Sequence, residues 1–175
     1  AGIAGGRRGL ELLGITPVGD LHFETNEDAN RVVRCQYPDA QCLGDVLECT
    51  EDMLRKAVGN LGAVQVVVRT NGPPCQDVTG LSATRVGFGG NRSSLAAAVP
   101  KIDAMLKRIF PNARMIKITE MVASLSAEDQ IQYNRLGKGE PLKICAGDIS
   151  YGRRPRLYWV NFTLTPQPHV VFSRE

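Results

Sequence analysis

The sequence predicts an α/β fold in which a mainly parallel sheet has helices on both faces. Short β-branched apolar runs alternate with segments whose apolar residues recur at helical spacing. Several of the runs end on an acidic residue or a cysteine. With 175 residues, 43% hydrophobic and 22% charged, the chain is long enough for one hydrophobic core. No repeat or linker interrupts it, so we expect one domain over residues 1–175, and no apolar run is long enough to predict a membrane span.

The chain opens with a predicted turn, a short helix and a strand. The glycine-rich turn at residues 2–6 leads into a helix through residues 10–13, which Gly14 can end. Residues 21–24 are typical of a short strand, and that strand ends on Glu24.

A second helix and a second strand follow. Asn26 suits the N-cap of the helix, with two acids in its first turn, and we expect Val32 and Val33 on its buried face. The run at residues 41–43 leads into Gly44-Asp45-Val46, which is another strand end.

The clearest strand of the sequence covers residues 64–68, which are rich in valine. A polar helix over about residues 51–60 precedes it, and the strand leads directly into Asn71-Gly72-Pro73-Pro74-Cys75-Gln76. A long helix over about residues 93–110 follows, and Pro100 is expected to kink it or to delay its start. The residues of this helix expected to face the core are Leu95, Val99, Ile102, Leu106 and Ile109.

Chemically useful side chains lie at the ends of four predicted strands. Three further strands are expected at residues 115–120, 142–146 and 157–162, the first of which ends on Glu120. In an open α/β sheet, ligands bind at the carboxyl ends of the strands. The strand-end groups Glu24, Asp45, Cys75 and Glu120 are therefore candidates for one site.

Among the five cysteines, Cys75 has an unusual context. An odd number of cysteines without a C-x-x-C pair argues against a zinc site and against a complete set of disulfides, and favours a reducing compartment. The ordinary role of a free cysteine is that of a small buried apolar residue. Two prolines directly after a buried strand instead hold the Cys75 thiol on a stiff turn, which makes it a candidate nucleophile.

Four segments resemble, in order, the motifs of the cytosine-5 DNA methyltransferases, and their residues and spacing are nearest to those of the eukaryotic de novo group. Residues 71–77 resemble the catalytic Pro-Cys motif, and residues 85–95 resemble the glycine-rich loop that leads into a helix. Residues 119–122 resemble the Glu-Asn-Val motif, and residues 153–161 resemble the Arg-x-Arg motif with the strand after it. The resemblance covers nearly the whole chain. It implies a Rossmann-like methyltransferase fold and methyl transfer to carbon 5 of cytosine in DNA.

The resemblance also implies roles for four catalytic residues. The Cys75 thiolate adds to carbon 6 of a base flipped out of the duplex, which makes carbon 5 nucleophilic. Glu120 holds the cytosine edge at N3 and supplies or shares a proton. Arg156 is expected to contact the base and Arg154 to support it, because alternate residues of a strand face one side.

S-adenosylmethionine is the implied cofactor, with S-adenosylhomocysteine as the product and no metal. Glu24 is expected at the ribose hydroxyls and Asp45 at the adenine amino group. The ordinary alternative for each acid is a solvated strand-end charge or a helix cap. The complete set of expected cofactor-binding residues is Gly2, Ile3, Ala4, Glu24, Asp45, Val46 and Pro74.

DNA is the implied partner, although the net charge of +3 is too small to argue for it. The glycine-rich segment 76–94 suits a loop that closes over the flipped base. Arg85 and Arg92 are candidates for phosphate contacts, and the alternative for each is a solvated loop charge. A DNA methyltransferase is expected inside the cell, and in the nucleus of a eukaryote.

The sequence departs from the family pattern at three places. It begins at Ala1 within the first motif, it has Met121 where Asn is usual, and it stops at Glu175 before the target-recognition region. We therefore interpret it as a catalytic domain truncated at both ends. Two alternatives stay open: a methyltransferase-like binding or regulatory module with impaired catalysis, and an RNA cytosine-5 methyltransferase.

Overall fold

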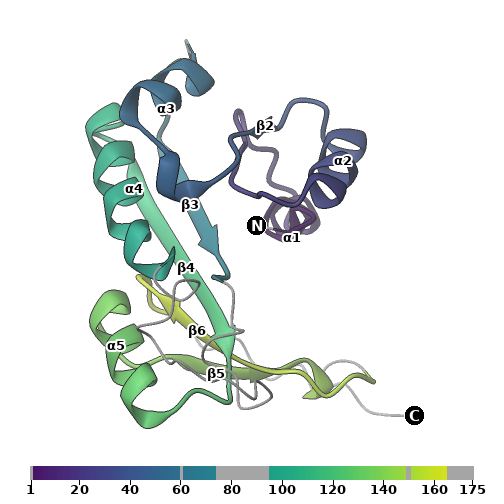
Figure 1. Cartoon of the computed structure of the whole chain (residues 1–175), viewed down its shortest axis with the longest axis vertical. Helices are drawn as coiled ribbons and strands as arrows, with labels where there is room; N and C mark the ends of the chain where they lie inside the picture. The colour runs from purple at the N-terminus through teal and green to yellow at the C-terminus, as the bar shows by residue number, and fades with distance from the viewer. Residues whose placement is uncertain (1, 60, 74–94, 149–150, 165–175) are drawn as a thin grey trace. The chain divides into compact units, whose positions relative to one another are not determined.

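A computed structural model describes residues 2–59, 61–73, 95–148 and 151–164 (Figure 1). The chain divides into two compact units. Unit 1 comprises residues 1–67 and 94–115, and unit 2 comprises residues 68–93 and 116–175. Helices and strands alternate through both units, so the α/β fold class is confirmed. The prediction of a single domain stays a prediction.

Unit 1 begins with α1 (Gly5–Leu12), β1 (Leu21–His22), α2 (Glu27–Gln36) and β2 (Gln41–Cys42). The two strands are parallel, with Leu21 opposite Gln41 and His22 opposite Cys42. Because the strands run in the same direction, the residues that follow them emerge at the same edge of this small sheet. Glu24 and Asp45, which the sequence predicts at strand ends, follow these two strands.

The caps of α1 and α2 are those that the sequence predicts. Gly14 has φ +73°, and its N–H donates to the carbonyl oxygen of Glu11. The Asn26 side chain accepts a hydrogen bond from the N–H of Ala29 at 3.0 Å. One prediction for α2 is wrong: Val33 is buried, but Val32 is exposed. The inward position one turn away from Val33 belongs instead to the buried Asn30, whose side chain donates to the carbonyl oxygen of Glu24.

The core of unit 1 is built mainly by α3 (Glu51–Val58) and α4 (Leu95–Ile109). Ile102 and Leu106 are buried, as predicted, and Ile109 packs against them from the edge of the core. Pro100 lies inside α4 rather than before it. The buried members of this cluster are Cys49, Leu54, Ile102, Met105 and Leu106.

Two strands run through both units. They are β3 (Val66–Asn71) and β4 (Arg114–Val122), both of which cross the boundary between the units. The predicted strand at residues 64–68 therefore begins two residues later and continues to Asn71, and it brings the strand end to the Pro-Cys motif.

Unit 2 also contains α5 (Ala127–Gly137), β5 (Leu142–Cys145) and β6 (Pro155–Val160). The strand order is β3-β4-β6-β5, and β6 is antiparallel to both of its neighbours. The sheet is mixed. Strands β5 and β6 form an antiparallel pair because the short connection between them turns the chain back on itself.

Helix α5, which the sequence analysis did not predict, covers one face of this sheet through Trp159. The Trp159 ring stacks on Tyr133 with 5.4 Å between ring centroids, and its Nε1–H donates to Asn134 Oδ1 at 2.9 Å. Among the described residues, no helix is long and apolar enough to cross a membrane.

Candidate active site

Glu120 and Arg156 form an ion pair in unit 2, with 2.5 Å between Glu120 Oε1 and Arg156 Nε. Glu120 lies opposite Tyr158 and Val122 lies opposite Arg156, so the two charged residues are diagonal neighbours on one sheet face. Their side chains are 34% and 17% exposed respectively. The pair therefore combines partial shielding from water with access from solvent.

The Glu120 carboxylate also lies against the start of the Pro-Cys motif. A Cβ built on Gly72 would lie 2.9 Å from Glu120 Oε2, which is too close for any other residue without a shift. The Glu120 carboxylate therefore lies directly against Gly72, and a side chain at this position would displace it. Glu120, Arg156 and the first residues of the motif come together in unit 2.

A polar cluster beneath the motif was missed in the sequence. Arg69 lies in the middle of a valine-rich strand, where its guanidinium donates to Thr119 Oγ1 at 3.0 Å and also contacts Asn71 Oδ1. The Thr119 hydroxyl donates to the same Asn71 oxygen at 2.8 Å. The cluster joins β3 to β4 at Asn71, the last residue of β3 and the first of the Pro-Cys motif. A charged residue inside an apolar run was the available signal.

Met121, which stands where the family motif has Asn, faces away from the Glu120–Arg156 pair. It lies opposite Leu157 in the register of β4 with β6, and it is 1% exposed. Leu157 and Trp159 lie two residues apart on β6 and are both buried, so Met121 belongs to the sheet face that α5 covers. Its apolar side chain suits that face.

Of the remaining predicted residues in unit 2, only Arg154 is described. It is exposed just before β6, and its backbone carbonyl accepts the N–H of Ala146 at 3.2 Å. The other predictions lie outside the described residues: Pro74, Cys75, Arg85, Arg92 and the loop over residues 76–94. They stay predictions.

In unit 1, Glu24 follows β1 and binds backbone donors with both carboxylate oxygens. Oε2 accepts the N–H of Gly2 at 2.7 Å, and Oε1 accepts those of Thr25 and Asn26 at 2.9 Å each. Partial burial alone would raise the pKa of Glu24. Hydrogen bonds from the N–H groups of Asn26 and Gly2 act in the opposite direction, and the pKa is lowered to about 2. Glu24 is thus a fixed carboxylate that is ionised at neutral pH.

The predicted cofactor turn lies beside Glu24. Gly2 has φ +65° and Ala4 has φ +64°, so the chain takes two left-handed residues before α1 begins. His22 Nε2 lies 3.0 Å from the carbonyl oxygen of Gly2, which ties the turn to β1 a second time. Ala4 is buried, whereas Ile3 between them is exposed. The turn and the end of β1 are therefore one local structure.

Asp45 follows β2, and its carboxylate caps the short 3₁₀ helix η1 (Val46–Glu48) by accepting the N–H of Leu47 at 2.9 Å. The capping role that the sequence left open is thus present. The Asp45 side chain is half-buried, and Val46 packs against the core of unit 1. Because β1 and β2 are parallel neighbours, Glu24 and Asp45 lie at the same sheet edge.

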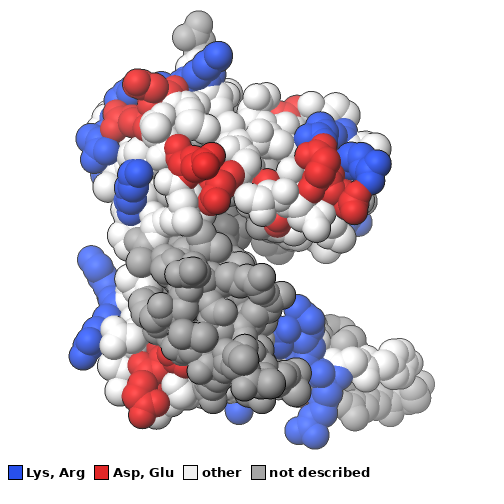
Figure 2. Space-filling view, viewed as in Figure 1, with Lys and Arg blue, Asp and Glu red and all other residues white. Residues whose placement is uncertain are grey.

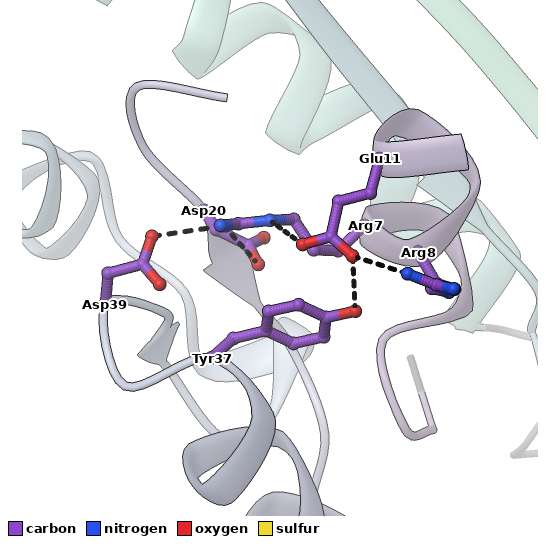
Figure 3. Close-up of polar contacts among 6 residues, drawn as sticks. All are labelled: Arg7, Arg8, Glu11, Asp20, Tyr37 and Asp39. Carbon is purple, nitrogen blue, oxygen red and sulfur yellow. Dashed lines mark hydrogen bonds and ion pairs between the residues drawn. The ribbon is translucent and has the colours of Figure 1, made fainter. Parts of the chain in front are cut away.

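Arg7 supports the same region from α1 (Figure 3). Its guanidinium forms ion pairs with Glu11, Asp20 and Asp39 at 3.6, 3.5 and 3.1 Å. The guanidinium carbon also lies 4.9 Å from the centroid of the Tyr37 ring. The Arg7 side chain is only 9% exposed, so these contacts fix α1 to the segments before β1 and after α2.

No protein-family model matches the chain, and no curated protein matches it. Among solved structures, the Dnmt2 methyltransferase of S. pombe has a TM-score of 0.58 and 16% sequence identity, over 94% of this chain and 50% of that chain. A Dnmt2 variant from Spodoptera frugiperda gives the same TM-score and identity, over 97% of this chain and 51% of that chain.

The chain shares the fold of these two structures. At 16% identity the likeness establishes the Rossmann-like fold alone, which confirms the predicted fold class. The chain spans about half the length of the two Dnmt2 structures.

Proposed function

We propose that this chain is the catalytic part of a cytosine-5 methyltransferase that uses S-adenosylmethionine and acts on DNA, in the nucleus where the host is a eukaryote. The observation that carries the proposal is the Glu120–Arg156 pair, which lies against Gly72 at the start of the Pro-Cys motif. The methyltransferase fold of the Dnmt2 structures supports it.

The proposed chemistry begins at Cys75. Its thiolate forms a bond from Sγ to carbon 6 of cytosine, and the electron pair released from the double bond makes carbon 5 nucleophilic. Carbon 5 then takes the methyl group, and S-adenosylhomocysteine leaves. Loss of the proton on carbon 5 re-forms the double bond and expels the Cys75 thiolate, which restores the enzyme.

Glu120 and Arg156 serve the edge of the base in this scheme. Negative charge builds on the ring as the thiolate adds, so a group at N3 must supply or share a proton. Glu120 takes that role because its carboxylate is held by Arg156 on a rigid strand and reaches the backbone of the motif that carries Cys75. Arg156 also offers donors to the cytosine oxygen.

The residues of unit 1 fit the cofactor. S-adenosylmethionine supplies the methyl group when bound. The ionised Glu24 carboxylate accepts hydrogen bonds from the ribose hydroxyls through Oε2, because Oε1 already accepts two backbone N–H groups. The turn at Gly2 lets the protein backbone approach the methionine portion of the cofactor closely. Asp45 accepts a hydrogen bond from the adenine amino group through the carboxylate oxygen that does not cap η1.

The test is covalent trapping with S-adenosylmethionine on a DNA duplex that contains 5-fluorocytosine. After methyl transfer fluorine cannot leave carbon 5 as a proton does, so the adduct accumulates. We expect an adduct with the wild-type chain and none with Cys75→Ser. Cys35→Ser is the matched control because Cys35 is an exposed free thiol in unit 1, and it should trap normally. Glu120→Gln should slow adduct formation by about 10²–10⁴-fold.

Three results would change the proposal. Trapping on the matched RNA and not on DNA would assign the chain to RNA substrates. Normal S-adenosylhomocysteine binding without an adduct on either polymer would favour a binding or regulatory module. An adduct that persists in Cys75→Ser would exclude Cys75 as the nucleophile.

A further inference from the structure

Tyr151 is a large aromatic residue that is fully exposed, at 110% of its reference area. It lies in the connection between β5 and β6, and Gly152, Arg153 and Arg154 follow it directly. Aromatic rings normally pack against apolar neighbours or hydrogen-bond at one end. Nothing in the proposed chemistry uses Tyr151, so its exposed ring calls for another explanation.

The hairpin that carries this tyrosine also carries exposed basic residues, two of them close behind Tyr151 in the sequence and one on β5. Lys143, Arg153 and Arg154 are all exposed, and within the described part of the chain none of them forms an ion pair. Arg156, by contrast, is engaged with Glu120. The described residues of the hairpin, 142–148 and 151–160, contain four basic residues and a single acid, Asp148. Figure 2 shows Lys and Arg side chains gathered in blue over this part of unit 2.

The basic residues are held on an ordered hairpin. The Ala146 N–H donates to the carbonyl oxygen of Arg154, which extends the pairing of β5 with β6 beyond the strands. A Cβ built on Gly147 would lie 3.2 Å from Arg153 Cγ, so the stem of Arg153 lies directly over this glycine. Strand β5 is an edge strand of the four-stranded sheet, and most of the described residues of the hairpin are exposed to solvent.

We propose that the β5–β6 hairpin binds a single-stranded segment of nucleic acid. The Tyr151 ring stacks on a base, and Lys143, Arg153 and Arg154 contact the phosphates on either side. An acidic protein or an anionic membrane would interact with the positive charges, but neither would require an exposed aromatic ring. A polymer that has both bases and phosphates accounts for the ring and the charges together. That the bound nucleic acid is also the substrate rests on the proposed function, whereas the binding itself rests on the hairpin alone.

The test is fluorescence anisotropy with labelled oligothymidylate and the matched RNA oligonucleotide, without cofactor. Tyr151→Ala should weaken binding by about 5- to 100-fold, and Tyr151→Phe should restore it because the ring is kept. Arg153→Ala should weaken binding and lower the slope of log affinity against log salt by about 0.7. Arg135→Ala, an exposed arginine on α5 of the same unit, is the matched control and should bind as wild type does.

The proposal is overturned if Tyr151→Ala and Arg153→Ala both bind like wild type. It is also overturned if Arg135→Ala loses as much affinity as Arg153→Ala, since binding would then follow total charge. Poly-glutamate that competes equally with the oligonucleotide, together with no effect of Tyr151→Ala, would assign the surface to acidic polymers instead. Failure of 5-fluorocytosine trapping with hairpin-dependent binding intact would reject the proposed function and leave this inference standing.

Discussion

At the scale of single residues, Met121 is an apolar core residue rather than a defective catalytic one. It is 1% exposed and lies opposite the buried Leu157. Met121→Asn would place an amide without partners in that core, which should lower the free energy of unfolding by about 2–4 kcal/mol. Met121→Leu, of similar volume, should cost less than about 1.5 kcal/mol. Urea unfolding of both variants checks the difference, and equal stability of Met121→Asn and wild type would contradict this packing.

Glu24 leads to a prediction about pH. Its pKa in the folded chain is about 2, against an ordinary value of 4.5, so the ionised form is favoured by folding. The stabilisation is fully present above about pH 4.5 and is lost as the pH falls toward 2. Glu24→Gln should therefore be less stable than wild type at neutral pH, and the gap should narrow on acidification below pH 4.5. Urea unfolding at a series of pH values measures the gap, and a constant gap would contradict the prediction.

At the scale of elements, the contact of α5 with β6 depends on the absence of a side chain at Gly137. A Cβ there would lie 2.6 Å from Trp159 Cγ, so Gly137→Ala must push the ring off Tyr133. We expect a loss of about 1–3 kcal/mol in the free energy of unfolding. Gly139→Ala is the matched control because nothing lies within 4 Å of its Cβ position. Trp159 is the sole tryptophan, so its fluorescence follows the transition, and equal stability of the two variants would exclude this close packing.

Helix α1 depends on Arg7 in a similar way. Burial alone would lower the pKa of Arg7, but Asp39, Asp20 and Glu11 together raise it above its ordinary value. Arg7→Ala leaves these carboxylates without their shared cation and should cost about 2–3 kcal/mol, somewhat below the cost of breaking a fully buried pair. Arg8→Ala is the matched control, since the Arg8 side chain is 64% exposed, and should change stability by less than about 0.5 kcal/mol. Chemical unfolding compares them, and a similar cost for both would remove the special role of Arg7.

Features that depend on neighbouring residues could be predicted from the sequence, whereas features that depend on distant parts of the chain could not. The acids that follow β1 and β2 could be placed because apolar runs and caps mark strand ends and helix starts. Helix α5 was missed because it has few apolar residues, although Ser126 capping Asp129 was a usable signal. The face on which Met121 lies could not be predicted, because it depends on the register of β4 with β6 and thus on residues far along the chain.

At the scale of the whole molecule, the two units are linked by continuous structure. Strands β3 and β4 each begin in unit 1 and end in unit 2, so neither unit can unfold without disturbing strands of the other. The predicted cofactor residues Glu24 and Asp45 belong to unit 1, and the Glu120–Arg156 pair belongs to unit 2. We therefore expect one cooperative unfolding transition, in which a ligand of unit 1 also stabilises unit 2.

This coupling can be measured with S-adenosylhomocysteine and two optical signals. At about 100 times its Kd the ligand should add about 2.7 kcal/mol, which corresponds to a rise in Tm of about 5–10 °C for a chain of this size. Trp159 fluorescence reports on unit 2 and far-ultraviolet circular dichroism on both units, and the two midpoints should rise together. Glu24→Gln should abolish the rise, whereas Glu27→Gln, an exposed acid on α2, should keep it. A rise seen by circular dichroism alone would mean that the units unfold separately. An undiminished rise in Glu24→Gln would remove Glu24 from the cofactor site, and no rise in wild type would reject the cofactor half of the proposed function.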